Sequence, residues 1–306
     1  MAKQDFETLN ISVLKALVFF QKEKPIRLNV KKYTFPIVIG SGNAYHAGQI
    51  IFSQQKALFA TETNLIEVFK RYKDLIKSKV VTHAVVISAS GEKDSVWEIK
   101  LAKKIGLKTV LLTCSPNSTA AKLADEVHSF RKLEEPYTYN VSTYLGMILA
   151  AGGEKAADIA ASILKLKLPN NFKKFKAYAF ILPDEMASIT PMIEIKKSEL
   201  FGPNLSIRAF SYGEARHAKF VIREKSELVI SFGENKYFGN SNNRLIITPP
   251  KNAGAAWMMA VNYFLVGLIQ SAKPDYFSKN IKKFCADYGY KAYPDAKPFT
   301  TIVPGN

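Results

Sequence analysis

The chain has 306 residues, of which 47% are hydrophobic, so it can bury a sizeable core in one large domain or two medium ones. Its formal net charge is +17, but the excess is mostly lysine spread along the chain, which favours a solvated surface over nucleic-acid binding. No uninterrupted apolar run of about 18 residues occurs, which argues against a membrane span or a membrane partner.

The predicted elements of the first half alternate between strands and helices. In chain order they are a strand over 35–40, a helix from Ala44, a strand over 83–88, a helix ending at Gly106, a strand over 107–112, a brief strand near Val127 and a helix over 140–153. This alternation indicates right-handed βαβ units around a parallel sheet.

The second half begins with an amphipathic helix and charged linker over 154–175. A second alternating series follows, with a strand over 177–182, a helix near 185–201 and three short apolar runs, SIRAF, ELVISF and RLIITP. The sequence therefore predicts an N-terminal domain over 1–153, a linker helix over 154–175 and a C-terminal domain with a tail over 176–306.

A long apolar helix is predicted over 252–270, and we expect it to be buried between the domains. Its length would also suit a poor membrane helix, but Asn262 and the small residues favour packing in a core. The aromatic-rich segment DYFSKNIKKFCADYGYKAYP follows this helix.

The two cysteines and the N-terminal segment predict the cellular setting. Neither Cys114 nor Cys285 has neighbours at metal-ligand spacing, so we expect no metal site and a reducing, cytoplasmic environment. The stretch MAKQDFETLNISVLKALVFF has an early acidic residue and no small-residue cleavage site, which indicates an ordinary helix and not a signal peptide.

Small hydroxyl residues and glycines gather where two predicted strands end, in GSGNA (40–44) and SASG (88–91). Ligands of open parallel sheets bind at the carboxyl ends of the strands. Serine hydroxyls, a glycine and the free N–H groups of a following helix suit a phosphate, and no Walker spacing is present. A polar strand-to-helix turn is the alternative for either loop alone, but their repetition favours an anion site.

With these motifs, the chain resembles the sugar isomerase (SIS) family in its two-domain arrangement, most closely the isomerase half of glucosamine-6-phosphate synthase and related isomerases and deglycases. IGSGNAYHAG is similar to the family's first loop, VISASGEKDS to its S-x-S-G-E-T stretch and EEPYTYNVSTY to the loop before the next helix. The resemblance implies two flavodoxin-like, three-layer αβα subdomains with parallel sheets. It also implies a homodimer that binds a small sugar phosphate and needs no cofactor.

The resemblance implies a set of substrate-binding residues. Relatives have a threonine where this chain has Lys93 and often a sugar-contacting serine where it has Ala44. The phosphate would lie on the serines and amides of the SASG stretch, and the other loops would touch the sugar. The residues concerned are Gly42, Asn43, Ala44, Ser88, Ala89, Ser90, Gly91, Lys93, Val141 and Ser142.

The stretch KKSELFGPNLSIRAFSYGEARHAKF resembles the family's K-x-x-E helix and the histidine motif that follows it. Lys196 and Glu199 fall at the K-x-x-E positions, and the resemblance implies that Glu199 is the catalytic base. His217 would open the sugar ring, a role often filled across a dimer interface in relatives. The chain departs from the family in having no lysine near Thr300 or Thr301, and Lys297 is out of register.

The implied function is a phosphosugar isomerase, acting on a hexose or amino-hexose 6-phosphate through an enediol, or related deglycase or deaminase chemistry. Such chemistry needs a carboxylate near C1 and C2 and a proton carrier at the ring oxygen, as Glu199 and His217 would provide. A non-catalytic sugar-phosphate sensor is the alternative, which Ala44 and the absent tail lysine favour.

Overall fold

A computed structural model of the chain describes residues 6–220, 223–273, 276–292 and 299–306, which form two compact units. The first-sheet unit comprises the described residues of Glu23–Leu133, Ser142–Gly153 and Gly305–Asn306. The second-sheet unit comprises those of Met1–Lys22, Glu134–Val141 and Glu154–Pro304. The N-terminal helix thus groups with the C-terminal half of the chain, and the domain limits expected at 153 and 176 stay a prediction.

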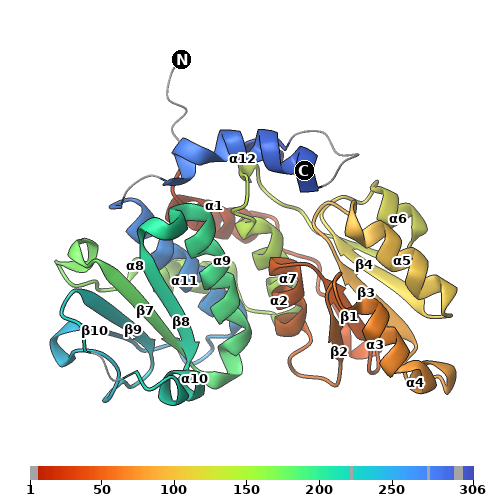
Figure 1. The fold of residues 1–306 in the computed structure, drawn as a ribbon, viewed down its shortest axis with the longest axis horizontal. Helices are drawn as coiled ribbons and strands as arrows, with labels where there is room; N and C mark the ends of the chain where they lie inside the picture. Colours follow the sequence, from red (N-terminus) through yellow and green to blue (C-terminus); the bar gives the residue numbers. More distant parts are fainter. Residues whose placement is uncertain (1–5, 221–222, 274–275, 293–298) are drawn as a thin grey trace. The chain divides into compact units, whose positions relative to one another are not determined.

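The first-sheet unit is built on a five-stranded sheet in the order β2-β1-β3-β4-β5, with all neighbouring strands parallel (Figure 1). Its strands are β1 (Ile37–Gly40), β2 (Leu58–Ala60), β3 (His83–Ile87), β4 (Lys108–Thr113) and β5 (Glu126–Ser129). Its helices are α2 (Asn43–Ile51), α3 (Leu65–Arg71), α4 (Lys73–Lys77), α5 (Asp94–Lys104), α6 (Thr119–Leu123) and α7 (Val141–Gly152).

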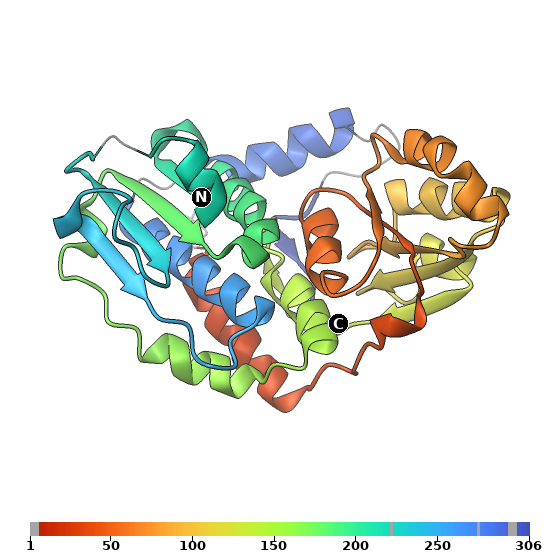
Figure 2. The same ribbon diagram turned by 90° about the horizontal axis from the view of Figure 1, so that it is seen from below.

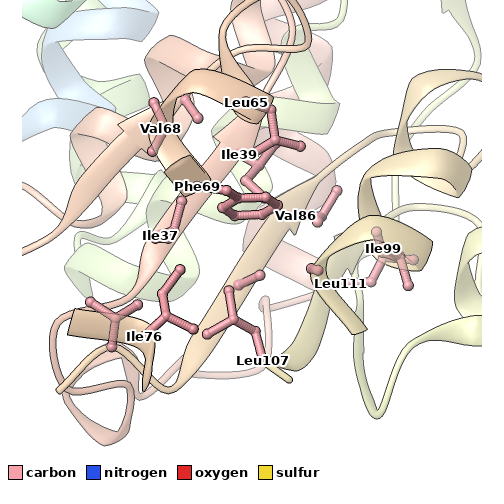
Figure 3. Close-up of a cluster of buried hydrophobic side chains, with 14 of the residues drawn as sticks. Ile37, Ile39, Leu65, Val68, Phe69, Ile76, Val86, Ile99, Leu107 and Leu111 are labelled. Atoms are coloured by element: carbon pink, nitrogen blue, oxygen red, sulfur yellow. The ribbon is translucent and has the colours of Figure 1, made fainter. Parts of the chain in front are cut away.

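Apolar residues fill both faces of this sheet, as expected for buried parallel strands. On one face, Ile37, Ile39 and Val86 pack with side chains of α3, α4, α5 and α6 in a cluster of buried residues (Figure 3). On the other face α2 approaches closely, because a Cβ added at Gly48 would lie 2.8 Å from the Val38 side chain. The unit is therefore a three-layer sandwich.

The second-sheet unit contains a four-stranded parallel sheet in the order β10-β9-β7-β8. Its strands are β7 (Ala177–Leu182), β8 (Ser206–Ser211), β9 (Glu227–Phe232) and β10 (Arg244–Ile247), and β6 (Glu135–Pro136) pairs antiparallel with β11 (Ile302–Val303). Its α-helices are α1 (Leu9–Lys22), α8 (Ala156–Leu164), α9 (Thr190–Phe201), α10 (Tyr212–His217), α11 (Ala255–Gln270) and α12 (Tyr276–Ala292).

Helix α11 forms the core of the second-sheet unit and lies beside α1 and α8 (Figure 2). Trp257 packs edge-on against Phe232 of β9, and its indole N–H donates to Ser162 Oγ at 2.8 Å. Helices α1 and α11 nearly touch at Gly267, because a Cβ added there would lie 1.9 Å from the backbone nitrogen of Asn10 in α1. The helix is buried as predicted, in the core of the second-sheet unit, and its expected position between the domains stays a prediction. None of the helices in the described part of the chain has the length and apolar content needed to cross a bilayer.

The fold class expected from the sequence is confirmed. The order of the first sheet is the flavodoxin-like one, and the second sheet repeats it without a fifth strand. The helix expected over 185–201 begins later, because Asp184–Ile189 forms a 3-10 turn before α9. The helix expected within 154–175 ends at Leu164. Short strand β2 and helices α3, α4 and α12 were not predicted.

Candidate functional site

The two loops singled out in the sequence lie at the point where the strand order of the first sheet reverses. From β1 the chain passes to β2 on one side, and β3 lies on the other side, with Gly40 beside Ile87 at their carboxyl ends. The loops that follow β1 and β3 therefore diverge at the same edge. This is the position where open α/β sheets bind ligands.

The SASG loop after β3 is a tight turn held by its own hydroxyls. Ser88 Oγ accepts from the Gly91 N–H at 3.2 Å, and Ser90 Oγ accepts from the Glu92 N–H at 3.3 Å. Gly91 has a φ of +62°, and a Cβ there would lie 2.0 Å from Ser118 Oγ. Only glycine fits this position.

Neighbouring segments fasten the SASG loop in place. The Ala89 carbonyl accepts from the Cys114 N–H at 3.0 Å and from Thr113 Oγ1 at 3.2 Å. On the far side, Glu92 Oε1 accepts from the Thr119 N–H at 2.9 Å. The backbone is thus already ordered in the absence of a ligand. Binding an anion would therefore cost little conformational entropy of the loop.

Lys93 directly follows this loop and precedes the first turn of α5, with a φ of +58°. Lys93 is an exposed residue. Partial desolvation of its ammonium group nevertheless lowers the pKa of Lys93, and the negative charge of Asp94 opposes that shift. Lys93 therefore places a positive charge beside this helix terminus.

The loop after β1 contains a buried amide with an unused acceptor. Gly42, with a φ of +54°, precedes α2, and no side chain caps this helix terminus. Asn43 is only 8% exposed, and its Oδ1 has no hydrogen-bond partner among the described residues. This oxygen is therefore an acceptor that a hydroxyl donor could pair with. Ala44 is buried against the end of β1, and a role for it in sugar binding stays a prediction.

The third predicted contact, at Val141 and Ser142, lies at the start of α7. Both residues are fully buried, and Ser142 Oγ accepts from the Leu133 N–H at 2.9 Å. Its hydroxyl therefore already has a structural use, and a role in sugar binding stays a prediction.

Lys196 and Glu199 lie on the same face of α9 in the second-sheet unit, three residues apart. Lys196 is fully buried, and its ammonium donates to Glu199 Oε2 at 2.6 Å and to the Thr138 carbonyl. Burial raises the pKa of Glu199 above its ordinary value, and the Lys196 ammonium opposes that shift. The lysine thus orients a carboxylate whose side chain stays 25% exposed.

The exposed edge of Glu199 borders a cavity of about 250 Å³. Helix α12 forms most of its wall, and the side chains that matter here are Tyr276, Phe277, Ile281 and Phe284. A ligand bound in this mostly apolar cavity would exclude bulk water, and the Glu199 carboxylate could then exchange protons with the ligand. His217 does not line this cavity; it is the exposed last residue of α10, after β8.

Sequence reasoning missed two features near these sites. One is α12, whose apolar residues 277, 281 and 284 recur at helical spacing. The other is Glu98 on α5, which is 2% exposed with no partner for Oε1 among the described residues. Burial, followed by the charges of Asp94 and Glu62, raises the pKa of Glu98 to about 8. Within the described residues, no group of three His, Cys, Asp or Glu side chains is arranged to hold a metal ion.

No model of a protein family matches this chain, and no curated protein sequence matches it. Solved structures do. The C-terminal domain of glucosamine-fructose-6-phosphate aminotransferase from Francisella tularensis superposes with a TM-score of 0.56 at 15% identity, covering 90% of this chain and 99% of that one.

Two further structures have the same architecture. Glucosamine-6-phosphate deaminase from Thermotoga maritima matches with a TM-score of 0.59 at 16% identity, over 86% of this chain and 94% of that one. Tagatose-6-phosphate ketose/aldose isomerase from Escherichia coli matches with a TM-score of 0.57 at 14% identity, over 86% and 90%. The chain therefore has the fold of the two-domain SIS proteins, and the resemblance inferred from its motifs is confirmed at the level of the fold.

Proposed function

We propose that this protein is a phosphosugar isomerase, or an enzyme of the related deaminase or deglycase chemistry. The observation that carries the proposal is Glu199, a carboxylate oriented by a buried lysine at the wall of a cavity. Structures with this fold include a ketose/aldose isomerase and a deaminase of sugar phosphates, which supports the same kind of reaction here.

Glu199 is the proposed base. A carboxylate can take the proton from one carbon of an open-chain sugar and return it to the next, which passes through an enediol. Its raised pKa improves its basicity, and the Lys196 ammonium keeps the carboxylate oriented. The neighbouring carboxylates are less suited, because Glu194 accepts from the Ala209 N–H and Glu214 accepts from the Ser211 N–H.

Phosphate binding is proposed for the first-sheet unit, through Ser88, Ser90 and the amides around Gly91. The fastened turn supports this assignment, and the unused Oδ1 of Asn43 is an acceptor suited to a sugar hydroxyl. Lys93 would supply positive charge in place of the threonine hydroxyl of relatives.

Solvent-deuterium exchange into hexose 6-phosphates and amino-hexose 6-phosphates tests the proposed base. Glu199→Gln is expected to lower the exchange rate by about 10² to 10⁴, because a positioned general base contributes that much, and to leave sugar-phosphate affinity nearly unchanged. Glu185→Gln, an exposed carboxylate of the same unit, is the matched control and should exchange like the parent. A parent protein that binds a sugar phosphate but exchanges no deuterium into it would favour the sensor.

His217 and the oligomeric state belong to the same proposal. We assign ring opening to His217, supplied by a second copy of the chain in a homodimer. His217→Asn should slow reaction of a closed-ring substrate more than that of an open-chain analogue. Light scattering is expected to give twice the 34.2 kDa chain mass, and a monomer at micromolar concentration would contradict the dimer.

A further inference from the structure

A second cavity lies at the reversal point of the second sheet. From β7 the chain passes to β8 on one side, and β9 lies on the other, so the loops after β7 and β9 diverge as those after β1 and β3 do. A cavity of about 370 Å³ occupies this position. Its size lies within the range of small-molecule sites. Residues following all three strands line it, among them Asp184, Tyr212, Arg216, Tyr237 and Phe238.

The wall supplied by the loop after β9 is held rigidly. Asn235 is buried, and its Oδ1 accepts from the N–H groups of Tyr237 at 3.2 Å and Phe238 at 2.9 Å. The guanidinium of Arg244 donates to four carbonyls of the same loop, between 2.8 and 3.3 Å. Because these bonds fix the backbone, the cavity is preformed.

Four charged side chains line this cavity. Lys236 and Glu234 pair with each other at 2.9 Å. This leaves Arg216 and Asp184 available to a ligand. The guanidinium of Arg216 is exposed and has no hydrogen-bond or ion-pair partner among the described residues. Asp184 is also exposed, and the N–H of Gly213, donating at 2.7 Å, lowers the pKa of its carboxyl, which therefore stays ionised. A guanidinium binds phosphate oxygens in pairs, and a carboxylate accepts from hydroxyls.

Aromatic rings complete the cavity. Tyr212 and Phe238 lie with ring centroids 6.1 Å apart, and Tyr237 is 72% exposed. Flat apolar faces of this kind stack on nucleobases. An aliphatic sugar phosphate would leave the rings uncovered, and a neutral aromatic molecule would leave Arg216 unused.

We propose that this cavity binds a nucleoside 5′-monophosphate. Its phosphate lies on Arg216, its ribose hydroxyls donate to Asp184, and its base stacks on the rings of Tyr212 and Tyr237. This site rests on the same chain but not on the same residues as the proposed phosphosugar site, because its lining contains neither Glu199 nor His217 and none of the loop residues of the first-sheet unit.

Equilibrium dialysis of the full chain against AMP tests the proposal, with adenosine and ribose 5-phosphate as the two partial ligands. AMP should bind with a dissociation constant below about 1 mM, and each partial ligand should bind about tenfold or more weakly, since each lacks one set of contacts. Absence of AMP binding at that concentration, or equal binding of ribose 5-phosphate, would overturn the assignment.

Matched variants locate the bound nucleotide. Arg216→Gln should weaken AMP about tenfold and leave adenosine unchanged, because only the phosphate contact is lost. Arg223→Gln removes an exposed arginine outside the cavity and should bind AMP like the parent. Ser90→Ala should also leave AMP binding intact. Unaltered affinity in Arg216→Gln, or lost affinity in Ser90→Ala, would refute the site.

Discussion

The two sheets share one strand order but hold their ligand-side loops by different means. After β3, the turn is short and is fastened by small hydroxyls and by backbone groups of the adjoining segments. After β9, a longer loop is fastened by one buried amide, Asn235, and one guanidinium, Arg244. The first arrangement leaves serine hydroxyls that can donate to an anion, whereas the second leaves long charged and aromatic side chains. One topology thus presents two different chemistries.

Replacing one glycine in each loop should give the largest contrast. Gly91→Ala combines a φ of +62° with a Cβ 2.0 Å from Ser118 Oγ, so strain and overpacking together should lower the free energy of unfolding by about 4 kcal/mol. Gly233→Ala has a φ of +104° but meets only the Tyr212 hydroxyl at 3.6 Å, so about 1–2 kcal/mol is expected. Urea denaturation measures both, and equal losses would contradict the tighter packing of the first loop.

Replacing the buried Glu98 and the exposed Glu234 should have different effects on the stability of the protein in alkaline solution. Glu98 has an unfolded-state pKa near 4.5 and a folded-state pKa of about 8, so its folded form binds the extra proton and stability falls as pH rises through this window. Glu98→Gln should therefore be more stable than the parent by on the order of 3 kcal/mol at pH 9 and similar to it at pH 4. Glu234→Gln, at an exposed carboxylate near the second cavity, should differ from the parent by less than about 0.5 kcal/mol at both values. Thermal unfolding measured between pH 4 and pH 9 tests this prediction. A Glu98→Gln protein with the same pH profile as the parent would show that the pKa of Glu98 is not raised in the folded protein.

The dependence of the second loop on a single arginine can be tested directly. Arg244→Gln removes up to four hydrogen bonds to carbonyls and should lower the free energy of unfolding by about 2 kcal/mol. The same variant should bind AMP more weakly although Arg244 does not line the cavity. Arg223→Gln serves as the control in denaturation and in dialysis. An Arg244→Gln protein with unchanged stability would show that other contacts fix the loop.

The smallest expected effect is on phosphate affinity at the first loop. Ser90→Ala should weaken binding of fructose 6-phosphate or glucosamine 6-phosphate about tenfold, equivalent to about 1.4 kcal/mol, because one hydroxyl contact to an anion is lost. Ser241→Ala alters an exposed serine near the β9–β10 connection and should leave affinity unchanged. Calorimetry that gave one affinity for parent and both variants would remove Ser90 from the site.

The parts of the fold that sequence patterns predicted are those governed by local periodicity. The apolar runs ending at Gly40 and Ile87 identified the central strands, and the glycine and hydroxyls after them identified the loops. Strand β2 escaped because three residues are too few to show a period. Helix α12 escaped because its aromatic residues are separated by lysines, and its covering of the Glu199 cavity depends on tertiary packing.

The candidate site was predictable in its residue types but not in its bonding. The motif placed Lys196 and Glu199 at helical spacing, yet full burial of the lysine and its bond to the Thr138 carbonyl arise from segments 58 residues apart. Likewise, sequence could place Asn43 in a loop but could not show its unpaired oxygen. The sequence did not single out Arg216, because exposed arginines are common. Its position in the wall of a cavity is seen only in the structure.

The pairing of α1 with α11 has a consequence for synthesis. Asn10 of α1 packs against Gly267 of α11, so, although α8 can pack on α1 earlier, the packing of α1 is completed only after more than two hundred further residues have been translated. At roughly 5–20 residues per second, that interval is about 10–50 s. During this interval the first-sheet unit, whose strands lie between α1 and α11 in the chain, can fold on the ribosome before α1 has packed against α11. Chaperones that shield short apolar helices are therefore expected to engage the nascent chain at α1, and the second-sheet unit is expected to close last.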